Sequence, residues 1–438
     1  MVHQPVTNSP PKRRWGIACL LGFGVLVNYF DRVNLSVSQA ALHDTFAIST
    51  VTFGYLLSAY SWTYALCQIP SGVLLDKFGV RRVGLVSISL WSVASFAAAV
   101  STSIGGFFAA RFLLGVGEAP TFPGNAKAVG YWFPARERSL ATAIFDAAAK
   151  FASAIGVPIL GILLLSFGWR WSFAATAVTS LTYLALFAAF YRNPGDDKSL
   201  SPTERDLIVQ GGAQPEDPVH PGPAAPLAYL LRQPQVLGLT LGFAAYNYSF
   251  YLLLTWLPSY LSIAHHVDLL HSVAYTSVPW LFATFTDLLV GGWLVDALIQ
   301  RGRNPVRVRQ SILIGGMLLG LAMFGAAGAR TPIAALFWIS IALGGLAAAA
   351  PVAWSIPSLI APRRGVGTMG GIINFGSQVA AIAAPIITGY IVQATHSFSA
   401  AFIAAAVFLL IGIAGYVFLL GAMRPIAEPV PSEARDPQ

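Results

Sequence analysis

The chain has 438 residues, of which 56% are hydrophobic and only 10% are charged, and its mean hydropathy is +0.66. So few charged side chains cannot cover the surface of a water-soluble protein of this length, which excludes the soluble enzyme and soluble binding-protein classes. Hydrophobic stretches of about 20 residues, the length that crosses the hydrocarbon core of a bilayer, recur from end to end. The composition therefore predicts an all-α polytopic membrane protein.

In chain order, the apolar stretches predict twelve transmembrane helices. Their ranges are 15–39, 50–75, 83–102, 104–133, 138–165, 169–191, 236–262, 272–298, 308–328, 332–360, 366–394 and 398–421. The first stretch lacks an obvious cleavage site and is too long for a signal peptide, so it is expected to remain as the first helix.

A proline-rich polar stretch separates six predicted spans from the other six. It cannot bury a core and is expected to be a cytoplasmic linker, with one short surface helix near 202–210. The domains expected are an N-terminal six-helix bundle (1–192), the linker (193–234), a C-terminal six-helix bundle (235–425) and a disordered cytoplasmic tail (426–438).

The distribution of positive charge predicts the orientation in the membrane. If both termini are cytoplasmic, 20 of the 26 Lys and Arg residues fall in inside segments, and only Arg170 and Arg330 fall outside. Cytoplasmic loops carry such an excess of Lys and Arg, so both termini are expected inside. The net charge of +8 is explained by topology, and no nucleic-acid partner is expected.

The two halves contain related loops. GVLLDKFGVRR follows the second span and GWLVDALIQRGR follows the eighth, so Gly72 and Asp76 recur 220 positions later as Gly292 and Asp296. An offset of 228 also aligns the fifth span with the eleventh. Repeats of six helices are a transporter architecture, with the substrate site near the membrane midplane between the halves.

Ionisable residues inside the predicted spans are candidates for function, because burying a charged side chain in hydrocarbon costs roughly 2.5–3.5 kcal/mol on insertion scales. The four acids and four bases of this kind are Asp31, Glu118, Asp146, Asp287, Arg32, Arg111, Lys127 and Lys150.

The fourth span, RFLLGVGEAPTFPGN, places Arg111, Gly115 and Glu118 on one helix face. Its glycines allow close packing against a neighbouring helix, and its prolines are expected to kink the helix just past Glu118. By depth, Asp31, Arg32 and Arg111 are expected to meet in the outer half of the membrane. Glu118 is expected about two helical turns deeper.

These charges suggest a site for protons and an anion together. Desolvation favours the protonated form of a carboxyl group, whereas a nearby guanidinium favours the ionised form. An anion that binds the guanidinium removes this help, so anion and proton binding are linked thermodynamically. The two carboxylates, Asp31 and Glu118, are expected to carry protons while one of the arginines binds the anion. The alternative is a structural charge network that locks the first span to the fourth.

Asp146 and Lys150 have the i, i+4 spacing of an intrahelical salt bridge. Either they neutralise one another, or Lys150 faces the cavity opposite Asn374 and Gln378 of the eleventh span.

Two further charged residues, Lys127 and Asp287, stand outside this pair. Lys127 lies nearer the cytoplasmic end of its span and is expected to snorkel towards the interface. Asp287 is explained by neither scheme, and it is either a further protonation site or a partner for a neighbouring helix.

Aromatic and amide side chains near the middle of the spans complete the expected pocket. They are Tyr29, Tyr64, Tyr246, Asn247, Trp354, Asn374 and Gln378.

The chain resembles the major facilitator superfamily, through its six plus six spans and the loop GVLLDKFGVRR, which is similar to the superfamily's cytoplasmic gating motif. NYFDRVNLS and RFLLGVGEAPTFPGN together resemble, more narrowly, the anion:cation symporter family. That family includes bacterial galactonate, glucarate, hexuronate, tartrate and phthalate carriers, and animal sialin and vesicular glutamate transporters.

The resemblance implies a role for each residue that matches a family motif. It implies proton coupling for Asp31 and Glu118, and positions near the substrate carboxylate and the coupling site for Arg32 and Arg111. It also implies contacts around the substrate for Tyr29, Tyr64 and Asn374, and gating between the bundles for Gly72, Asp76 and Arg81, with Asp296 as the repeat of Asp76.

The chain also departs from the family's pattern. FDAAAK (145–150) replaces a stretch that is usually uncharged, and Asp287 stands where small residues are common. The added lysine points to a second carboxylate on the substrate, as in an aldarate, a tartrate or an aromatic dicarboxylate.

Together these observations predict a proton-coupled symporter, not an enzyme, that imports a small organic anion across the bacterial inner membrane by alternating access. The expected partners are the anion, protons and the lipid bilayer, with no cofactor or metal, and the protein is expected to be a monomer. The alternative is a proton-antiporting exporter of drugs or metabolites on the same fold.

Overall fold

The computed structural model describes residues 12–47, 50–213, 225–265, 269–362, 365–395 and 397–428, and within these ranges the chain is helical with no β-strand. Most of the tail predicted at 426–438 lies outside the described residues.

The first half consists of seven helices. They are α1 (Arg13–Val37), α2 (Gln39–Phe46), α3 (Thr50–Val100), α4 (Ile104–Glu118), α5 (Thr121–Trp132), α6 (Arg138–Phe167) and α7 (Trp169–Phe190). The connecting segment contains α8 (Pro202–Gln210) and α9 (Leu227–Leu231). The short helix predicted near 202–210 is therefore present as α8.

The described part of the second half contains nine α-helices and two π-helical segments. They are α10 (Pro234–His265), α11 (Leu269–Thr286), η1 (Asp287–Leu294), α12 (Val295–Gln300), α13 (Pro305–Gly320), α14 (Met323–Ala327), α15 (Pro332–Ser355), α16 (Pro357–Ile360), α17 (Val366–Thr395), α18 (Phe398–Ala414) and η2 (Gly415–Leu420).

Nine of the described helices are long and apolar enough to cross a bilayer, and a bent pair within α6 raises the number to ten. One of the nine, Ala59–Val100, covers most of both the second and the third predicted span. The predicted fourth span is divided between α4 and α5, which explains why neither part passes as a span alone. All twelve predicted spans are thus helical, and their ends agree with the structure to within a few residues.

Two predicted interruptions take the form of breaks in helices. Gly79 divides α3 between the second and third spans, with φ 79° and ψ 165°, a conformation that glycine adopts without a steric penalty. The break predicted just past Glu118 is confirmed, because α4 ends at Glu118 and α5 begins at Thr121.

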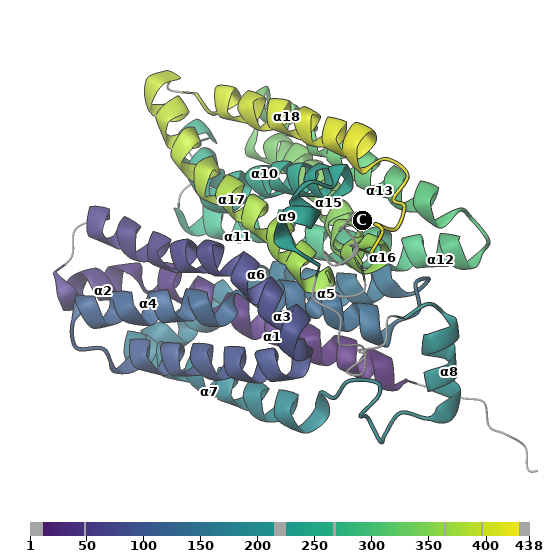
Figure 1. The fold of residues 1–438 in the computed structure, drawn as a ribbon. Helices are drawn as coiled ribbons and strands as arrows, with labels where there is room; N and C mark the ends of the chain where they lie inside the picture. The colour runs from purple at the N-terminus through teal and green to yellow at the C-terminus, as the bar shows by residue number, and fades with distance from the viewer. Residues whose placement is uncertain are drawn as a thin grey trace, which may run out of the picture.

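Figure 1 shows two helix bundles side by side, one formed by α1–α7 and the other by α10–α18. One end of both bundles carries α8 and the described ends of the chain. There Arg138 of α6 donates to the carbonyl oxygens of Gly212, just after α8, and of Ser358 in α16, at 2.8 and 2.5 Å. The amide of Ile426 donates to the carbonyl oxygen of Ile360, also in α16. We call this end the terminal side, and the positive charge of its loops predicts that it faces the cytoplasm.

The connecting segment is fastened to the first bundle. Glu204 of α8 is buried and lies 3.0 Å from the guanidinium of Arg14, and it also accepts a hydrogen bond from the backbone amide of Arg14 at 3.1 Å. Arg13 forms a second ion pair with Asp197 at 2.8 Å. The two arginines at the start of α1 therefore hold the segment against the terminal side.

Candidate functional site

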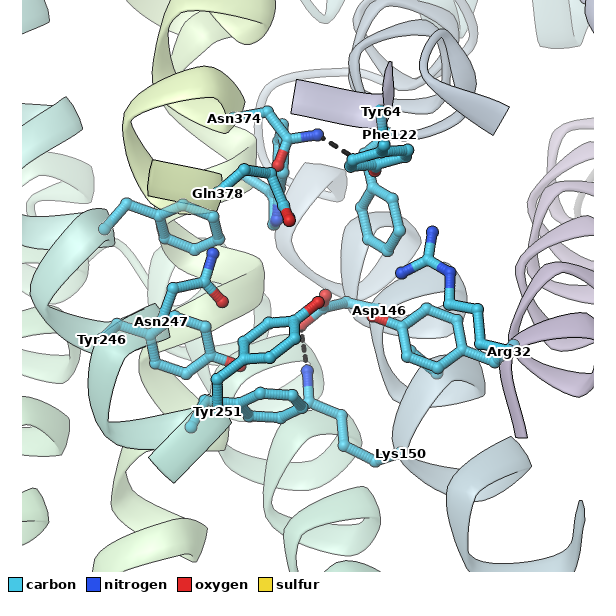
Figure 2. A pocket seen from close by; sticks show the side chains of 15 residues that line it. Arg32, Tyr64, Phe122, Asp146, Lys150, Tyr246, Asn247, Tyr251, Asn374 and Gln378 are labelled. Carbon is cyan, nitrogen blue, oxygen red and sulfur yellow. Dashed lines mark hydrogen bonds and ion pairs between the residues drawn. The ribbon is translucent and has the colours of Figure 1, made fainter. Parts of the chain in front are cut away.

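A cavity with about 400 Å³ of empty space lies between the two bundles. The first bundle contributes Tyr29, Arg32, Tyr64, Phe122, Asp146, Ala149 and Lys150, and the second contributes Phe243, Tyr246, Asn247, Phe250, Tyr251, Trp354, Asn374 and Gln378. Figure 2 shows the guanidinium of Arg32 on one side of the cavity and the amides of Asn247, Asn374 and Gln378 on the opposite side.

Arg32 of α1 enters the cavity wall with its guanidinium held from behind. Its Nη2 and Nε lie 3.0 and 3.1 Å from Oε2 of Glu118, and Nη2 also donates to Oδ1 of Asn28 at 2.8 Å. The guanidinium carbon lies 4.5 Å from the ring centre of Tyr29 and 5.0 Å from that of Tyr64, within range of cation–π attraction. The charge is therefore oriented towards the cavity and balanced by one carboxylate.

Glu118 stands behind Arg32, outside the lining of the cavity. Its exposed fraction is 0%, and its second oxygen, Oε1, has no hydrogen-bond partner in the described part of the chain. Glu118 was expected about two turns deeper than Asp31, Arg32 and Arg111, yet its side chain contacts the guanidinium of Arg32 directly. A ligand in the cavity can therefore contact the guanidinium of Arg32, and this guanidinium contacts the carboxylate of Glu118 on its other side.

Close helix packing makes this contact possible. A Cβ at Gly115 would collide with the backbone of Tyr60 and the side chain of Thr63, so a glycine at this position lets α4 approach α3. The approach places Tyr60, one turn before Tyr64 on α3, with its ring centre 4.8 Å from the guanidinium carbon of Arg32. The close packing predicted from the glycines of the fourth span is confirmed.

Asp31 and Arg111 lie near this pair but outside the cavity lining. The carboxylate of Asp31 accepts a hydrogen bond from the hydroxyl of Ser180 on α7 at 3.4 Å, and it is 1% exposed. Arg111 reaches Asp31 through the backbone carbonyl oxygen, at 3.3 Å. The predicted meeting of Asp31, Arg32 and Arg111 is thus only partly correct, since the adjacent Asp31 and Arg32 point to different partners. Arg111 was expected to bind substrate, but it does not line the cavity.

A second cation, Lys150 of α6, lies in the cavity wall. Its Nζ forms an ion pair with Asp146 one turn earlier on the same helix, and a second ion pair with Oδ2 of Asp287 in η1 at 2.7 Å. Both alternatives drawn from the sequence therefore hold together, because the intrahelical pair forms and both of its members line the cavity. Asp287, which had no assigned partner, joins the pair from the opposite bundle.

Amide and hydroxyl groups connect the bundles beside the cavity. Asn374 of α17 donates to the hydroxyl of Tyr64 at 3.2 Å and to Oε1 of Gln68 at 2.8 Å. Aromatic rings complete the wall: Trp354 lies 5.5 Å from Phe122 of the first bundle and 5.2 Å from Phe243, between ring centres. Nine of the ten residues predicted to bind substrate line the cavity.

Several site residues were not predicted from the sequence. Tyr60 and Gln68 lie one turn before and one turn after Tyr64, so the i, i+4, i+8 pattern on α3 would have identified them. Phe243, Phe250 and Tyr251 share a face of α10 with Tyr246 and Asn247, and Phe122 lies beyond the kink after α4.

Two acids join the bundles on the terminal side. Oδ1 and Oδ2 of Asp76 accept hydrogen bonds from the backbone amides of Gly367 and Thr368 at the start of α17, at 2.9 and 2.7 Å. Oδ1 and Oδ2 of Asp296 accept from the amides of Ser139 and Leu140 at the start of α6, at 3.3 and 2.8 Å. Each carboxylate meets the positive end of a helix dipole in the other bundle.

The remaining residues of the predicted gating motif have different contacts. A Cβ at Gly72 would collide with the carbonyl oxygen of Gly367, so this glycine allows α3 and α17 to touch. Arg81 instead donates to the carbonyl oxygens of Ala188 and Tyr191 at the end of α7, within the first bundle. The prediction that Lys127 snorkels is wrong: it is 3% exposed, and its Nζ pairs with Asp76 at 2.8 Å.

The sequence model of one protein family, the Major Facilitator Superfamily, matches residues 21–308. The chain belongs to this superfamily. Its fold is accordingly the superfamily's twelve-helix arrangement in two bundles, and it is a multi-pass membrane transporter. Over 94% of this chain and 98% of the other, the structure is similar to the proton:xylose symporter XylE, with a TM-score of 0.72 at 14% identity, a likeness that concerns the fold alone.

Curated relatives match nearly the whole chain. It is 36% identical to the uncharacterized transporter YybO of Bacillus subtilis, over 97% of this chain and 98% of the relative. It is 30% identical to the D-galactonate transporter of Escherichia coli (95% and 98% covered) and 33% identical to the probable galactarate/D-glucarate transporter GarP of Escherichia coli (94% and 95% covered). Proteins with sugar-acid substrates in their names are therefore among its relatives.

Proposed function

We propose that this transporter imports a small organic anion, such as a sugar acid, an aldarate or another mono- or dicarboxylate, together with protons across the bacterial inner membrane. The observation that carries the proposal is the position of Arg32 between the cavity and Glu118. A substrate carboxylate and the Glu118 carboxylate compete for one guanidinium, so anion binding weakens the hold on Glu118 and favours its protonation.

The surroundings of the two carboxylates fit a proton path. Glu118 has one oxygen without a hydrogen-bond partner among the described residues, which leaves an acceptor for a proton. Asp31, the second proposed proton carrier, interacts with the hydroxyls of Ser95, Thr176 and Ser180. Arg111 interacts with both carboxylates electrostatically, so we assign it to the coupling network.

The relatives support the substrate class. Galactonate carries one carboxylate and galactarate two, and both match a cavity whose wall contains Arg32 and Lys150 opposite three amides. The sugar hydroxyls of such a ligand would meet the amides of Asn247, Asn374 and Gln378, while the rings of Tyr29 and Tyr246 pack beside its carbon chain.

Transport by alternating access requires the bundles to separate on one side at a time. In this structure the contacts of Asp76 and Asp296 close the terminal side below the cavity. We propose that substrate and protons enter from the opposite side, and that breaking these contacts opens the cavity to the cytoplasm.

Reconstituted liposomes test the function. An inward proton gradient should drive accumulation of radiolabelled D-galactonate or galactarate. Glu118→Gln should retain exchange of substrate across the membrane but lose accumulation, because the amide cannot take up a proton. Asp206→Asn on exposed α8 is the matched control and should behave as the wild type.

Two results would overturn the proposal. Accumulation that survives Glu118→Gln removes the coupling role of this carboxylate. Efflux of the same anions against their gradient, driven by the inward proton gradient, would indicate the antiport alternative.

A further inference from the structure

Lys150 lies between two aspartates that come from different bundles. Asp146 is on its own helix, α6, and Asp287 opens the π-helical segment η1 of the second bundle. The side chains of Lys150, Asp146 and Asp287 are 2%, 6% and 0% exposed. Two carboxylates against one ammonium give the cluster a net charge of −1 when all three are ionised. A net charge buried this deeply in a membrane protein is strongly unfavourable, so a further positive charge is required.

A proton between the two carboxyl groups supplies both the charge and a missing donor. Oδ1 of Asp287 has no hydrogen-bond partner in the described part of the chain. Asp146 and Asp287 contact the same ammonium nitrogen, so the two carboxyl groups lie close together. Two carboxylates that share a site favour uptake of one proton, which lets one carboxyl group donate to the other.

No other cation faces Asp287 within the described ranges that pack around it. Besides Asp146 and Lys150 of α6, the hydroxyl of Tyr246 on α10 interacts with it electrostatically. The helix on the other side, α15, contains no titratable residue. On the continuous stretch of α11, η1 and α12 that contains Asp287, Tyr275 lies about three helical turns before it and Asp296 about two and a half turns after it.

We propose that Asp146, Lys150 and Asp287 form an additional proton-binding site of this transporter, distinct from Glu118 and Asp31. It holds one proton between its carboxyl groups while the terminal side is closed and releases that proton when this side opens. The inference rests on the proposed proton-coupled transport and adds one proton site to it.

The position of the cluster links it to the opening of the terminal side. Asp296 and Gly292, both on the run from η1 to α12, contact Leu140 of α6, and Asp287 contacts Lys150 further along the same two helices. Asp287 is roughly 13 Å from Asp296 along the helix axis. Asp287 is therefore the innermost of these three contacts with α6. Separation leaves Lys150 paired with Asp146 and exposes Asp287 to water, which lets it lose the proton on that side.

The cluster also repeats the arrangement at Arg32. Lys150 lines the cavity and Asp287 does not, just as Arg32 lines the cavity and Glu118 does not. An anion bound beside Lys150 attracts its ammonium away from Asp287. The carboxyl groups of Asp146 and Asp287 then bind their shared proton more tightly. Each cation of the cavity wall therefore connects the substrate to a fully buried carboxyl group behind it.

Infrared difference spectroscopy of the purified full-length transporter across a pH step tests the site without a substrate. A protonated carboxyl group has a carbonyl stretching band that carboxylate and amide lack. We expect the wild type to show a band that Glu118→Gln retains. Asp287→Asn and Asp146→Asn should each lose it, because either amide leaves one carboxylate balanced by Lys150. Asp206→Asn is the control.

The outcomes separate this site from the proposed function. A spectrum of Asp287→Asn and Asp146→Asn that keeps every carbonyl band of the wild type overturns the additional site, whatever the transport assay shows. Loss of the band in Glu118→Gln alone assigns the proton to Glu118 and also overturns it. Loss of the band when sodium replaces choline would assign the missing positive charge to Na⁺. The two aspartate variants are independent, so failure of one to fold leaves the other as the test.

Discussion

Asp76 and Asp296 make the same contact in opposite directions. Each carboxylate accepts hydrogen bonds from two consecutive backbone amides at the start of a helix in the other bundle, Gly367 and Thr368 for Asp76, and Ser139 and Leu140 for Asp296. The acids are 220 positions apart and the amides 228, the two offsets of the internal repeat. The terminal side is therefore closed by two related contacts.

Removing either carboxylate should open the terminal side, and Asp76 should have the larger effect. Hydrogen bonds to a charged group contribute about 1.5–3 kcal/mol each, so Asp296→Asn should raise the open population at least about tenfold. Asp76→Asn also leaves the buried Lys127 without its ion pair and should raise it further.

Labelling of a buried thiol measures this opening. Ser139→Cys, placed in a chain without Cys19 and Cys67, puts a thiol under the Asp296 contact, where the native side chain is 0% exposed. Both aspartate variants should increase the rate of maleimide labelling, and Asp206→Asn should not. Equal rates in all variants would mean that the acids do not hold the bundles together.

Arg32→Lys should impair transport although the charge is kept. The guanidinium contacts Glu118 through two nitrogens, Asn28 through one, and three tyrosine rings. An ammonium cannot reproduce this fork or stack in the same way. We expect the KM for the transported anion to rise by about tenfold or more, which corresponds to about 1.4 kcal/mol. Uptake into liposomes measures it, with Arg205→Lys on exposed α8 as the control; an unchanged KM would place the anion elsewhere.

Helix positions and most cavity residues were predictable, because each depends on local pattern. Apolar length defined the spans, and polar residues in mid-span identified Arg32, Lys150 and Asn374. What the sequence could not supply was the direction of each side chain. Asp31 and Arg32 are neighbours in the chain, yet successive helix positions point about 100° apart, so one faces α7 and the other the cavity.

Contacts between distant elements were the other limit. The partner of Asp287 lies on α6, more than a hundred residues earlier, and no periodicity within either helix encodes that pairing. Lys127 was misjudged for the same reason. Its depth suggested an exposed ammonium, whereas the ammonium pairs with Asp76, 51 residues earlier in the chain.

Lys150→Gln should destabilise the protein, and a second substitution should restore part of its stability. The single change leaves Asp146 and Asp287 buried without a cation. Breaking a buried ion pair on one side costs about 3–5 kcal/mol. The double variant Lys150→Gln with Asp287→Asn leaves one buried carboxyl group without a cation instead of two, so it should recover part of the loss. Thermal unfolding in detergent measures this cycle, and additive effects of the two substitutions would show that the residues do not interact.

The same double variant tests what Lys150 recognises. Galactarate differs from galactonate in carrying a second carboxylate, so a ligand that spans Arg32 and Lys150 should stabilise the wild type more strongly as galactarate. The double variant lacks the ammonium and one of the two carboxyl groups that pair with it. Its thermal shift with galactarate should therefore fall to the shift with galactonate, while the shift with galactonate stays near that of the wild type. Equal loss for both ligands would indicate a disturbed cavity instead, and no loss for either would mean that Lys150 serves the proton and not the anion.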